Sequence, residues 1–524
     1  MMFMKKLNLT IVLYFFIQIV FAQNLNDAKK YLNQIDTKDL NKHLSIIASD
    51  EYEGRETGKA GQKLAAEYLR NEFQELELIP LSENGFFQEF HLVEKVLGKR
   101  SLEVNQTPFE IADHFFPVRD VNLINVLSNE VYFVGYGIND NKYNSFKDFD
   151  VAGKVIVAMS GEPQIEGKNL ISGTSEESLW SNTNKKIAEL RKLNPALIII
   201  VDANFKRNSK FYKHSLSSSQ LKLAYKQSKK NEVPAITASE DLVNALLAPN
   251  KKTIAKLSAK LNSSTIAPKA IKLKSTIKVD LEYLMQDMYS ENVIAYIRGT
   301  EKPDEHIFIT AHYDHIGAKD GEVFNGADDD GSGTVALLEI AQAFMAAKKE
   351  GKGPKRSIVF MAVSGEEKGL LGSEYYTDHP VVSLDQTVAN LNIDMIGRID
   401  NEHKDDTNYV YIIGSDKLST DLHNINEKAN EVAKLKLDYK YNDPNDPNRF
   451  YFRSDHYNFA KNNIPIIFYF NGVHEDYHKG GDEVSKIHFP MLAKRTQLVF
   501  LTAWEIANRE NRIVVDKANT DTTK

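Results

Sequence analysis

Histidines and acids follow several apolar segments in the C-terminal half of the chain, and such residues are suited to binding metal ions. Each of four segments with the composition of a buried β-strand leads into a candidate ligand: 307–311 into His312, 358–363 into Glu366 and Glu367, 388–393 into Asp394, and 464–470 into a loop that reaches His478. The carboxyl ends of the strands in an open α/β sheet meet at one edge, so we expect these side chains to lie together. Imidazole and carboxylate ligands without sulfur suit zinc, and also cobalt or manganese.

A run of three aspartates, Asp328–Asp330 in the loop NGADDDGSG, precedes a predicted helix. A carboxylate can bridge two ions, and this many ligands exceed the need of one tetrahedral ion, so the pattern favours two metal ions that share one aspartate, as in many hydrolases. Glu366 and Glu367 fit such a site because successive residues point in different directions: one binds a metal and the other acts as general base on a water molecule. Asp314 is placed to accept the second N–H of His312.

Each of these features alone has a commoner explanation. A histidine at a strand end is usually just hydrogen-bonded, acids before a helix usually cap it, and adjacent glutamates are usually solvated. The coincidence of histidines and acids at the ends of separate strands of one sheet favours the metal site.

The composition limits the other possibilities. The chain of 524 residues contains no cysteine, which excludes disulfides, thiol catalysis and cysteine-based zinc sites. Lys and Arg number 65 and Asp and Glu 72, and the resulting formal charge of -7 argues against a nucleic-acid partner. A hydrophobic share of 42% over this length is enough for two cores of ordinary size.

The N-terminus has the pattern of a secretory signal peptide. Lys5 and Lys6 precede an apolar run over 7–21, which ends in small residues before Gln23. The run is shorter than the roughly 20 residues that a spanning helix needs. We therefore expect residues 1–22 to be removed, leaving a mature protein without a stable membrane anchor, exported to a bacterial periplasm or secreted.

The segments between the candidate ligands predict the fold. Apolar strands alternate with helical stretches after residue 292, which indicates an α/β fold with a mostly parallel, doubly wound central sheet and helices on both faces. Residues 64–73 carry an apolar stripe at helical spacing. From about 105 to 275 the sequence changes to short strands and polar loops, which indicates an inserted β-rich domain.

At these residues the sequence resembles the co-catalytic zinc aminopeptidase family, which includes bacterial leucyl aminopeptidases and the glutamate carboxypeptidase and transferrin-receptor branch. The similar stretches are SDEYEGRETGKAGQKLAAEYL (49–69), AHYDHIG (311–317), NGADDDGSG (325–333), VSGEEKGLLGSEYY (363–376), LNIDMIGR (391–398), RSDHYNFA (453–460) and DYHKGGDE (476–483). The insert resembles a protease-associated domain through VYFVGYGI (131–138), DVAGKVIVAMSGEP (150–163), PALIIIVDA (195–203) and VPAITAS (233–239). Lys479 to Glu483 depart from the Thr-Pro-Asp-Asp that the family often has there, which leaves the substrate preference open.

The resemblance implies a role for each site residue. It makes His312 and Asp394 ligands of one zinc, Glu367 and His478 ligands of the other, Asp329 the bridge, and Glu366 the general base. Cobalt or manganese would be possible substitutes for the two zinc ions. It also implies a cis peptide bond between Asp329 and Asp330, and places Asp455 and His456 on the substrate side of the pocket.

The residue patterns and the resemblance together predict a domain order. This is a signal peptide over 1–22, the N-terminal part of the peptidase domain over 23–105, a protease-associated insert over 106–275, the catalytic domain over 276–510 and a disordered tail over 511–524.

The expected activity is removal of N-terminal residues from peptides with a free N-terminus. A carboxypeptidase or a glutaminyl cyclase of the same fold is the enzymatic alternative, and a binding protein that has lost catalysis is the other. The complete set of ligands argues against the last. The oligomeric state is not indicated.

Overall fold

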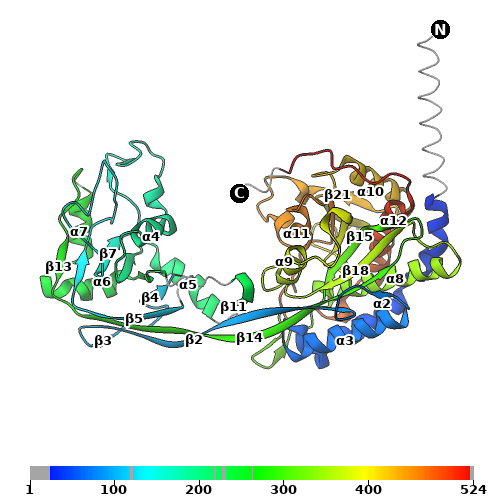
Figure 1. The fold of residues 1–524 in the computed structure, drawn as a ribbon, viewed down its shortest axis with the longest axis horizontal. Helices are drawn as coiled ribbons and strands as arrows, with labels where there is room; N and C mark the ends of the chain where they lie inside the picture. Colours follow the sequence, from blue (N-terminus) through cyan, green and yellow to red (C-terminus); the bar gives the residue numbers. More distant parts are fainter. Residues whose placement is uncertain (1–23, 119–121, 217–219, 227–231, 263, 520–524) are drawn as a thin grey trace, which may run out of the picture. The chain divides into compact units, whose positions relative to one another are not determined.

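The computed structural model describes residues 24–118, 122–216, 220–226, 232–262 and 264–519, so the predicted signal peptide lies outside the described residues. The chain forms two compact units: Met1–Leu92 with Met288–Lys524 form unit 1, and Val93–Asp287 form unit 2 (Figure 1). Both limits fall inside long strands, β2 (Phe87–Val104) and β14 (Ile277–Ile297). The sequence-based limits, after residue 105 and before residue 276, lie at the far ends of the same strands.

Unit 1 contains the elements that carry the candidate ligands. Its helices are α2 (Thr37–Ile47), α3 (Ala60–Glu75), α8 (Gly333–Lys349), α9 (Leu371–Asp378), α10 (Thr420–Ala433), α11 (His456–Ala460) and α12 (Phe489–Asn508). Its further strands are β1 (Ile79–Pro80), β15 (Lys302–His312), β16 (Ala318–Lys319), β17 (Glu322–Val323), β18 (Arg356–Val363), β19 (Thr387–Ile393), β20 (Tyr409–Ile413), β21 (Lys436–Asp438) and β22 (Ile466–Phe470).

The central sheet of unit 1 has the order β14-β18-β15-β19-β22-β20-β21. The pairs β15–β18, β15–β19 and β19–β22 are parallel, whereas β14 pairs with β18, and β20 with β22, in antiparallel fashion. The predicted α/β fold with a mostly parallel sheet is confirmed. Because β18, β15 and β19 are parallel neighbours, the residues that follow them emerge at one edge.

Alternate residues of the central strands face two different cores, as expected for a sheet covered on both faces. On β15, Ile307 and Ile309 belong to a core shared with α8 and α12, and Phe308 belongs to the opposite core with Phe459 of α11. Of the predicted stripe on α3, Leu69 and Phe73 are buried, but Leu64 is half exposed at 50%.

Residues 511–519 of the predicted disordered tail pack on unit 1. Ile513 is buried in the core with α12, and Arg512 donates hydrogen bonds to the carbonyls of Asp385 and Thr387. Ile513 anchors this segment, whereas the next two apolar residues, Val514 and Val515, are exposed at 58% and 48%. Residues 520–524 lie outside the described residues.

Unit 2 has its own six-stranded sheet, in the order β13-β6-β7-β10-β12-β4. The inner pairs β6–β7, β7–β10 and β10–β12 are parallel. Its strands are β3 (Thr107–Pro108), β4 (Phe115–Pro117), β5 (Leu123–Ser128), β6 (Val131–Phe133), β7 (Val155–Met159), β8 (Gln164–Ile165), β9 (Lys168–Asn169), β10 (Leu197–Val201), β11 (Gln220–Leu223), β12 (Ala235–Ala238) and β13 (Ile271–Leu273). Its helices are α4 (Thr183–Arg191), α5 (Phe205–Leu216), α6 (Glu240–Leu247) and α7 (Ile254–Leu261). In the described part of the whole chain, no helix combines the length and the apolarity needed to cross a bilayer.

The stability of unit 1 is expected to depend on the protonation of Glu339 in α8. Its side chain is 1% exposed and accepts one hydrogen bond, from the backbone N–H of Asp36, and burial raises its pKa to about 8. The contribution of the protonated form is fully present below the ordinary glutamate pKa of about 4.5 and is lost as the pH rises through about 8. The Glu339→Gln side chain stays neutral at every pH. The unfolding free energy of this variant, relative to that of wild type, should therefore be larger at about pH 9 than at pH 5, as measured by urea unfolding at both pH values. An equal difference at the two pH values would contradict this.

Candidate metal centre

The structure brings the predicted ligands together at the carboxyl edge of the unit 1 sheet. His312 ends β15, Glu366 and Glu367 follow β18, Asp394 follows β19, and His478 lies in the loop after β22. The aspartate run lies in a turn over Ala327–Ser332, immediately before α8. All of these side chains except that of His478, which is 38% exposed, are nearly or fully buried.

His312, Asp329 and Asp394 form the first of two groups. The Nε2 atom of His312 lies 3.3 Å from Oδ1 of Asp329 and 3.5 Å from Oδ1 of Asp394. The three residues offer ligand atoms that lie within 4.8 Å of one another. Such spacing suits one metal ion, because bonds of about 2 Å to a common ion separate its ligand atoms by roughly 3 Å.

The second group surrounds Glu367 and the other oxygen of Asp329. The Nε2 atom of His478 lies 3.1 Å from Oδ2 of Asp329 and 3.2 Å from Oε2 of Glu367. Asp329 therefore directs Oδ1 to the first group and Oδ2 to the second. The predicted cis peptide bond between Asp329 and Asp330 is present.

His315 also belongs to the second group, which sequence reasoning missed. Its Nδ1 atom lies 2.9 Å from Oε1 of Glu367 and 3.9 Å from Oδ2 of Asp329, and its ring is fully buried. The ring fits because residue 326 is glycine: a Cβ there would lie 2.5 Å from Cγ of His315. The stretch HYDH contains the signal, since His315 stands three residues after His312, but it lies beyond the strand end.

The residues present fit metal ions by their unsatisfied atoms. Several buried nitrogen and oxygen atoms of the two groups have no hydrogen-bond partner in the described structure. They are His312 Nε2, His315 Nδ1, Asp329 Oδ2 and Glu367 Oε1. Buried polar atoms are normally paired, and cations held by the two groups would satisfy all four atoms.

Charges within the groups shift the pKa values in opposite directions. Burial disfavours an imidazolium, yet Glu366 and Asp394 hold the pKa of His312 well above its ordinary value. Burial likewise opposes the charge of Asp329, but the neighbouring imidazoles of His312 and His478 hold its pKa well below the ordinary value. The pKa of His478 is raised to about 10, against its burial, by the nearby carboxylates of Asp329 and Glu367.

Glu366 lies beside both groups without joining either. Its Oε2 atom is 4.0 Å from Nε2 of His312, and its side chain lines the cavity above the cluster. Burial, helped by the charges of Glu367 and Asp394, raises its pKa well above the ordinary value. The neighbouring Glu367 behaves oppositely, because His315 and His478 outweigh its burial and lower its pKa to about 2.

The contacts of the Asp314 side chain differ from those predicted. The Nδ1 atom of His312 contacts the main-chain carbonyl of Asp314 at 3.0 Å, whereas the Asp314 carboxylate is 3.8 Å away. That carboxylate instead accepts from the Thr57 hydroxyl at 2.6 Å and from the Glu366 N–H at 3.3 Å. Asp314 therefore orients Glu366, and its carbonyl orients His312.

Asp455 and His456 are buried and do not line the cavity. Burial raises the pKa of Asp455 to about 7, and its carboxylate accepts from the Ser373 hydroxyl. His456 donates from Nε2 to the carbonyl of Tyr451 and stacks on Phe468. Their predicted place on the substrate side stays a prediction.

The loop that carries Asp329 is held from two sides. The Asp482 carboxylate accepts the backbone N–H groups of Asp328 and Asp329, at 3.0 and 3.1 Å. Arg55, which is fully buried, donates to the carbonyls of Asn325 and Gly326, at 2.7 and 3.0 Å.

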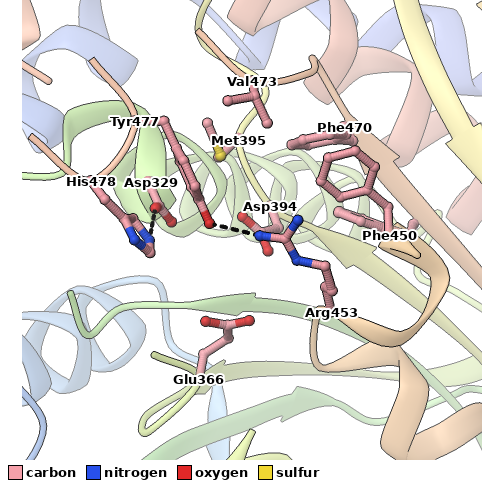
Figure 2. Close-up of a pocket in the computed structure, with 11 residues that line it drawn as sticks. Asp329, Glu366, Asp394, Met395, Phe450, Arg453, Phe470, Val473, Tyr477 and His478 are labelled. Atoms are coloured by element: carbon pink, nitrogen blue, oxygen red, sulfur yellow. Dashed lines mark hydrogen bonds and ion pairs between the residues drawn. The ribbon is translucent and has the colours of Figure 1, made fainter. Parts of the chain in front are cut away.

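One cavity opens over the cluster. It is lined by Asp329, Glu366, Asp394, Met395, Phe450, Arg453, Phe468, Phe470, Val473, Tyr477 and His478 (Figure 2). Three of these are acids of the cluster or next to it, and five are apolar, so the cavity offers a charged end for chemistry and an apolar wall for a side chain.

An α/β sheet whose strand ends carry two groups of histidines and carboxylates, sharing one aspartate, has the arrangement of ligands that is typical of metallohydrolases with bound divalent cations. Residues 292–503 match the family model described as peptidase family M28, so this part of the chain is similar to that family.

Several known peptidases are similar to this chain in sequence or in fold. Aminopeptidase NAALADL1 of Mus musculus is 34% identical over 123 residues, which is 23% of this chain and 16% of the relative. Probable glutamate carboxypeptidase LAMP1 of Arabidopsis thaliana is 35% identical over 119 residues, 22% of this chain and 16% of the relative. The match thus spans about a sixth of each curated relative. The aminopeptidase from Aneurinibacillus sp. strain AM-1 has a similar fold, with a TM-score of 0.55 and 16% identity over 94% of this chain and 98% of that one.

Removal of the Asp482 carboxylate should loosen the loop that carries Asp329. Asp482→Ala leaves two buried N–H groups unpaired, so we expect zinc to bind about ten- to hundredfold more weakly, as for other groups that support metal ligands. Competition with a chromogenic chelator measures this affinity. Glu475→Gln is the control, because Glu475 lies in the same loop as Asp482 and its side chain is 66% exposed. Equal zinc affinity for Asp482→Ala and the control would contradict the role of Asp482.

Proposed function

We propose that this chain is an exported aminopeptidase that uses two zinc ions to remove N-terminal residues from peptides. The observation that supports this best is the division of the Asp329 carboxylate between two groups of ligands, Oδ1 toward His312 and Oδ2 toward His478. One bridging carboxylate flanked by two such groups matches the pattern of hydrolases with paired metal ions.

In this proposal His312 and Asp394 would hold one ion, Glu367 and His478 would hold the other, and Asp329 would contribute to both sites. Cobalt or manganese would replace zinc, since all ligands are nitrogen or oxygen. When bound, the ions supply Lewis acidity and lower the pKa of a water molecule to near neutrality.

Glu366 is the general base of this proposal. It takes a proton from the attacking water as the peptide carbonyl is attacked, and returns that proton to the leaving amine. Its carboxylate lines the cavity and is positioned through the Asp314 carboxylate, which accepts the N–H of Glu366. The acids Asp329, Glu366 and Asp394 also make this end of the cavity attractive to the free α-ammonium group of a substrate.

A carboxypeptidase is the second candidate, since one similar protein carries the name of a probable glutamate carboxypeptidase. A glutaminyl cyclase, the other enzyme of the sequence-based expectation, would need one metal ion only. Peptides blocked at either end, and a peptide with N-terminal glutamine, separate the three activities.

The cellular location and the role of unit 2 belong to the same proposal. A signal peptide over 1–22 would direct the protein to a bacterial periplasm or the medium, and N-terminal sequencing that finds Met1 intact would contradict this. We propose that unit 2 is a protease-associated domain. Its separate core and its sheet with parallel inner strands support that assignment.

Glu366→Gln tests the general base. Because the amide cannot accept the proton, we expect kcat on leucine p-nitroanilide to fall by at least about a hundredfold, while two metal ions stay bound. Metal content is measured by mass spectrometry on the same sample. A variant with wild-type kcat would disprove this role.

Substitution of the shared aspartate tests the pair of ions. Asp329→Asn should lower the content of both ions, because Asp329 faces both groups, whereas Asp394→Asn should lower the content of one. The measurement is zinc per chain after dialysis against a weak chelator. One zinc per wild-type chain would exclude the two-ion proposal and favour the cyclase.

A further inference from the structure

Arg453 lines the cavity and has no part in the proposed metal centre. Among the described residues that line this cavity, it is the one with a permanent positive charge. It forms no ion pair with a carboxylate in the described part of the chain, although acids line the same cavity. A guanidinium with this environment is available to an anionic group of a substrate.

Two aromatic side chains hold the guanidinium in the cavity. Its central carbon lies 4.9 Å from the centre of the Phe450 ring, and Nη2 donates to the Tyr477 hydroxyl at 3.3 Å. Tyr477 in turn stacks on the ring of His478, with ring centres 4.0 Å apart. Arg453 is therefore one tyrosine side chain away from a predicted metal ligand, as Figure 2 shows.

The backbone at Arg453 is anchored by its neighbours. The Arg453 N–H donates to the carbonyl of Phe450 at 3.0 Å. The hydroxyl of Ser454 accepts from Asn392 of β19, and the carboxylate of Asp455 accepts from Ser373 of α9. The side chain thus starts from a fixed point, which lowers the entropy that binding a partner would cost.

We propose that Arg453 binds a carboxylate of the substrate, and that the enzyme prefers peptides that carry a carboxylate close to the cleaved bond. This inference rests on the proposed peptidase function. The carboxylate has two possible sources: the acidic side chain of an N-terminal Asp or Glu, or the C-terminus of a dipeptide. A guanidinium on an aromatic ring suits this role, since it offers paired N–H donors in one plane.

Charge separation within the cavity supports the choice of a carboxylate. Asp329, Glu366 and Asp394 repel an anion and attract the free amine, whereas the guanidinium of Arg453 offers a substrate carboxylate a permanent positive charge away from these acids. The apolar wall formed by Phe450 and Phe470 accepts the methylene groups or the side chain next to that carboxylate.

Two matched substrate pairs test the preference with the zinc-loaded protein. The first pair is glutamate and glutamine p-nitroanilide, and the second is Leu-Leu and Leu-Leu-amide. For wild type, we expect kcat/KM to be higher for the charged member of at least one pair. In Arg453→Met the ratio within that pair should fall about tenfold or more, and Arg453→Lys should keep part of it.

The pair that responds identifies the source of the carboxylate, an acidic side chain for the first and a C-terminus for the second. Arg449→Met is the control, because Arg449 stacks on Phe452, 4.8 Å from the ring centre, and does not line the cavity. Its ratios should equal those of wild type. Ratios that Arg453→Met leaves unchanged in both pairs, or that Arg449→Met lowers equally, overturn the proposal.

Direct binding keeps this test independent of the proposed activity. Calorimetry on zinc-loaded Glu366→Gln compares the dissociation constants of both substrate pairs, with and without Arg453→Met. Loss of Arg453 should weaken the charged member of the responding pair about tenfold relative to its neutral counterpart. If the wild-type protein removes no residue from peptides with a free N-terminus, the proposed function fails. The same dissociation constants still show whether Arg453 binds a carboxylate. Equal constants within both pairs in Glu366→Gln overturn the inference.

Discussion

Three consecutive buried aspartates must coexist in the turn before α8, and the rest of the site depends on how their charges are separated. Asp330 accepts the N–H groups of His312, Gly333 and Met395, and Asp328 accepts those of Gly397 and of the Asn471 side chain. Backbone and amide donors thus compensate two of the three carboxylates. Only Asp329, between them, has both oxygens directed at histidines. The selection of one aspartate from three follows from the placement of N–H groups on other segments.

Adjacent glutamates show the same dependence on neighbours. Glu366 and Glu367 are chemically identical and both buried, yet the pKa of one is raised and that of the other lowered to about 2. The difference arises because Glu367 contacts His315 and His478, whereas Glu366 has Glu367, Asp394 and Asp455 around it. Two roles for one residue type therefore require only that consecutive side chains leave a strand in different directions.

The sequence predicts the parts of this structure that depend on local pattern. Apolar runs located β15, β18, β19 and β22, and the rule that ligands gather at strand ends brought His312, Asp394 and both glutamates together. Prediction from the sequence failed where a contact depends on the conformation of a loop. Asp482 matters through backbone N–H groups 153 and 154 residues away, and His315 enters the site only because Gly326 leaves room for its ring. Ile513 begins a run of three apolar residues, Ile513–Val515, of which only Ile513 is buried, and so short a run does not show which of its residues is covered.

Arg55 connects parts of unit 1 that the chain makes at very different times. It precedes unit 2 in the sequence, and the carbonyls of Asn325 and Gly326 that it contacts lie 270 and 271 residues later. The N-terminal helices of unit 1 are therefore synthesised long before the loop that Arg55 supports. During that interval the whole of Val93–Asp287, with its own core, is made. The support that Arg55 gives to the Asp329 loop is therefore expected late in folding, because it requires so long a loop to close first.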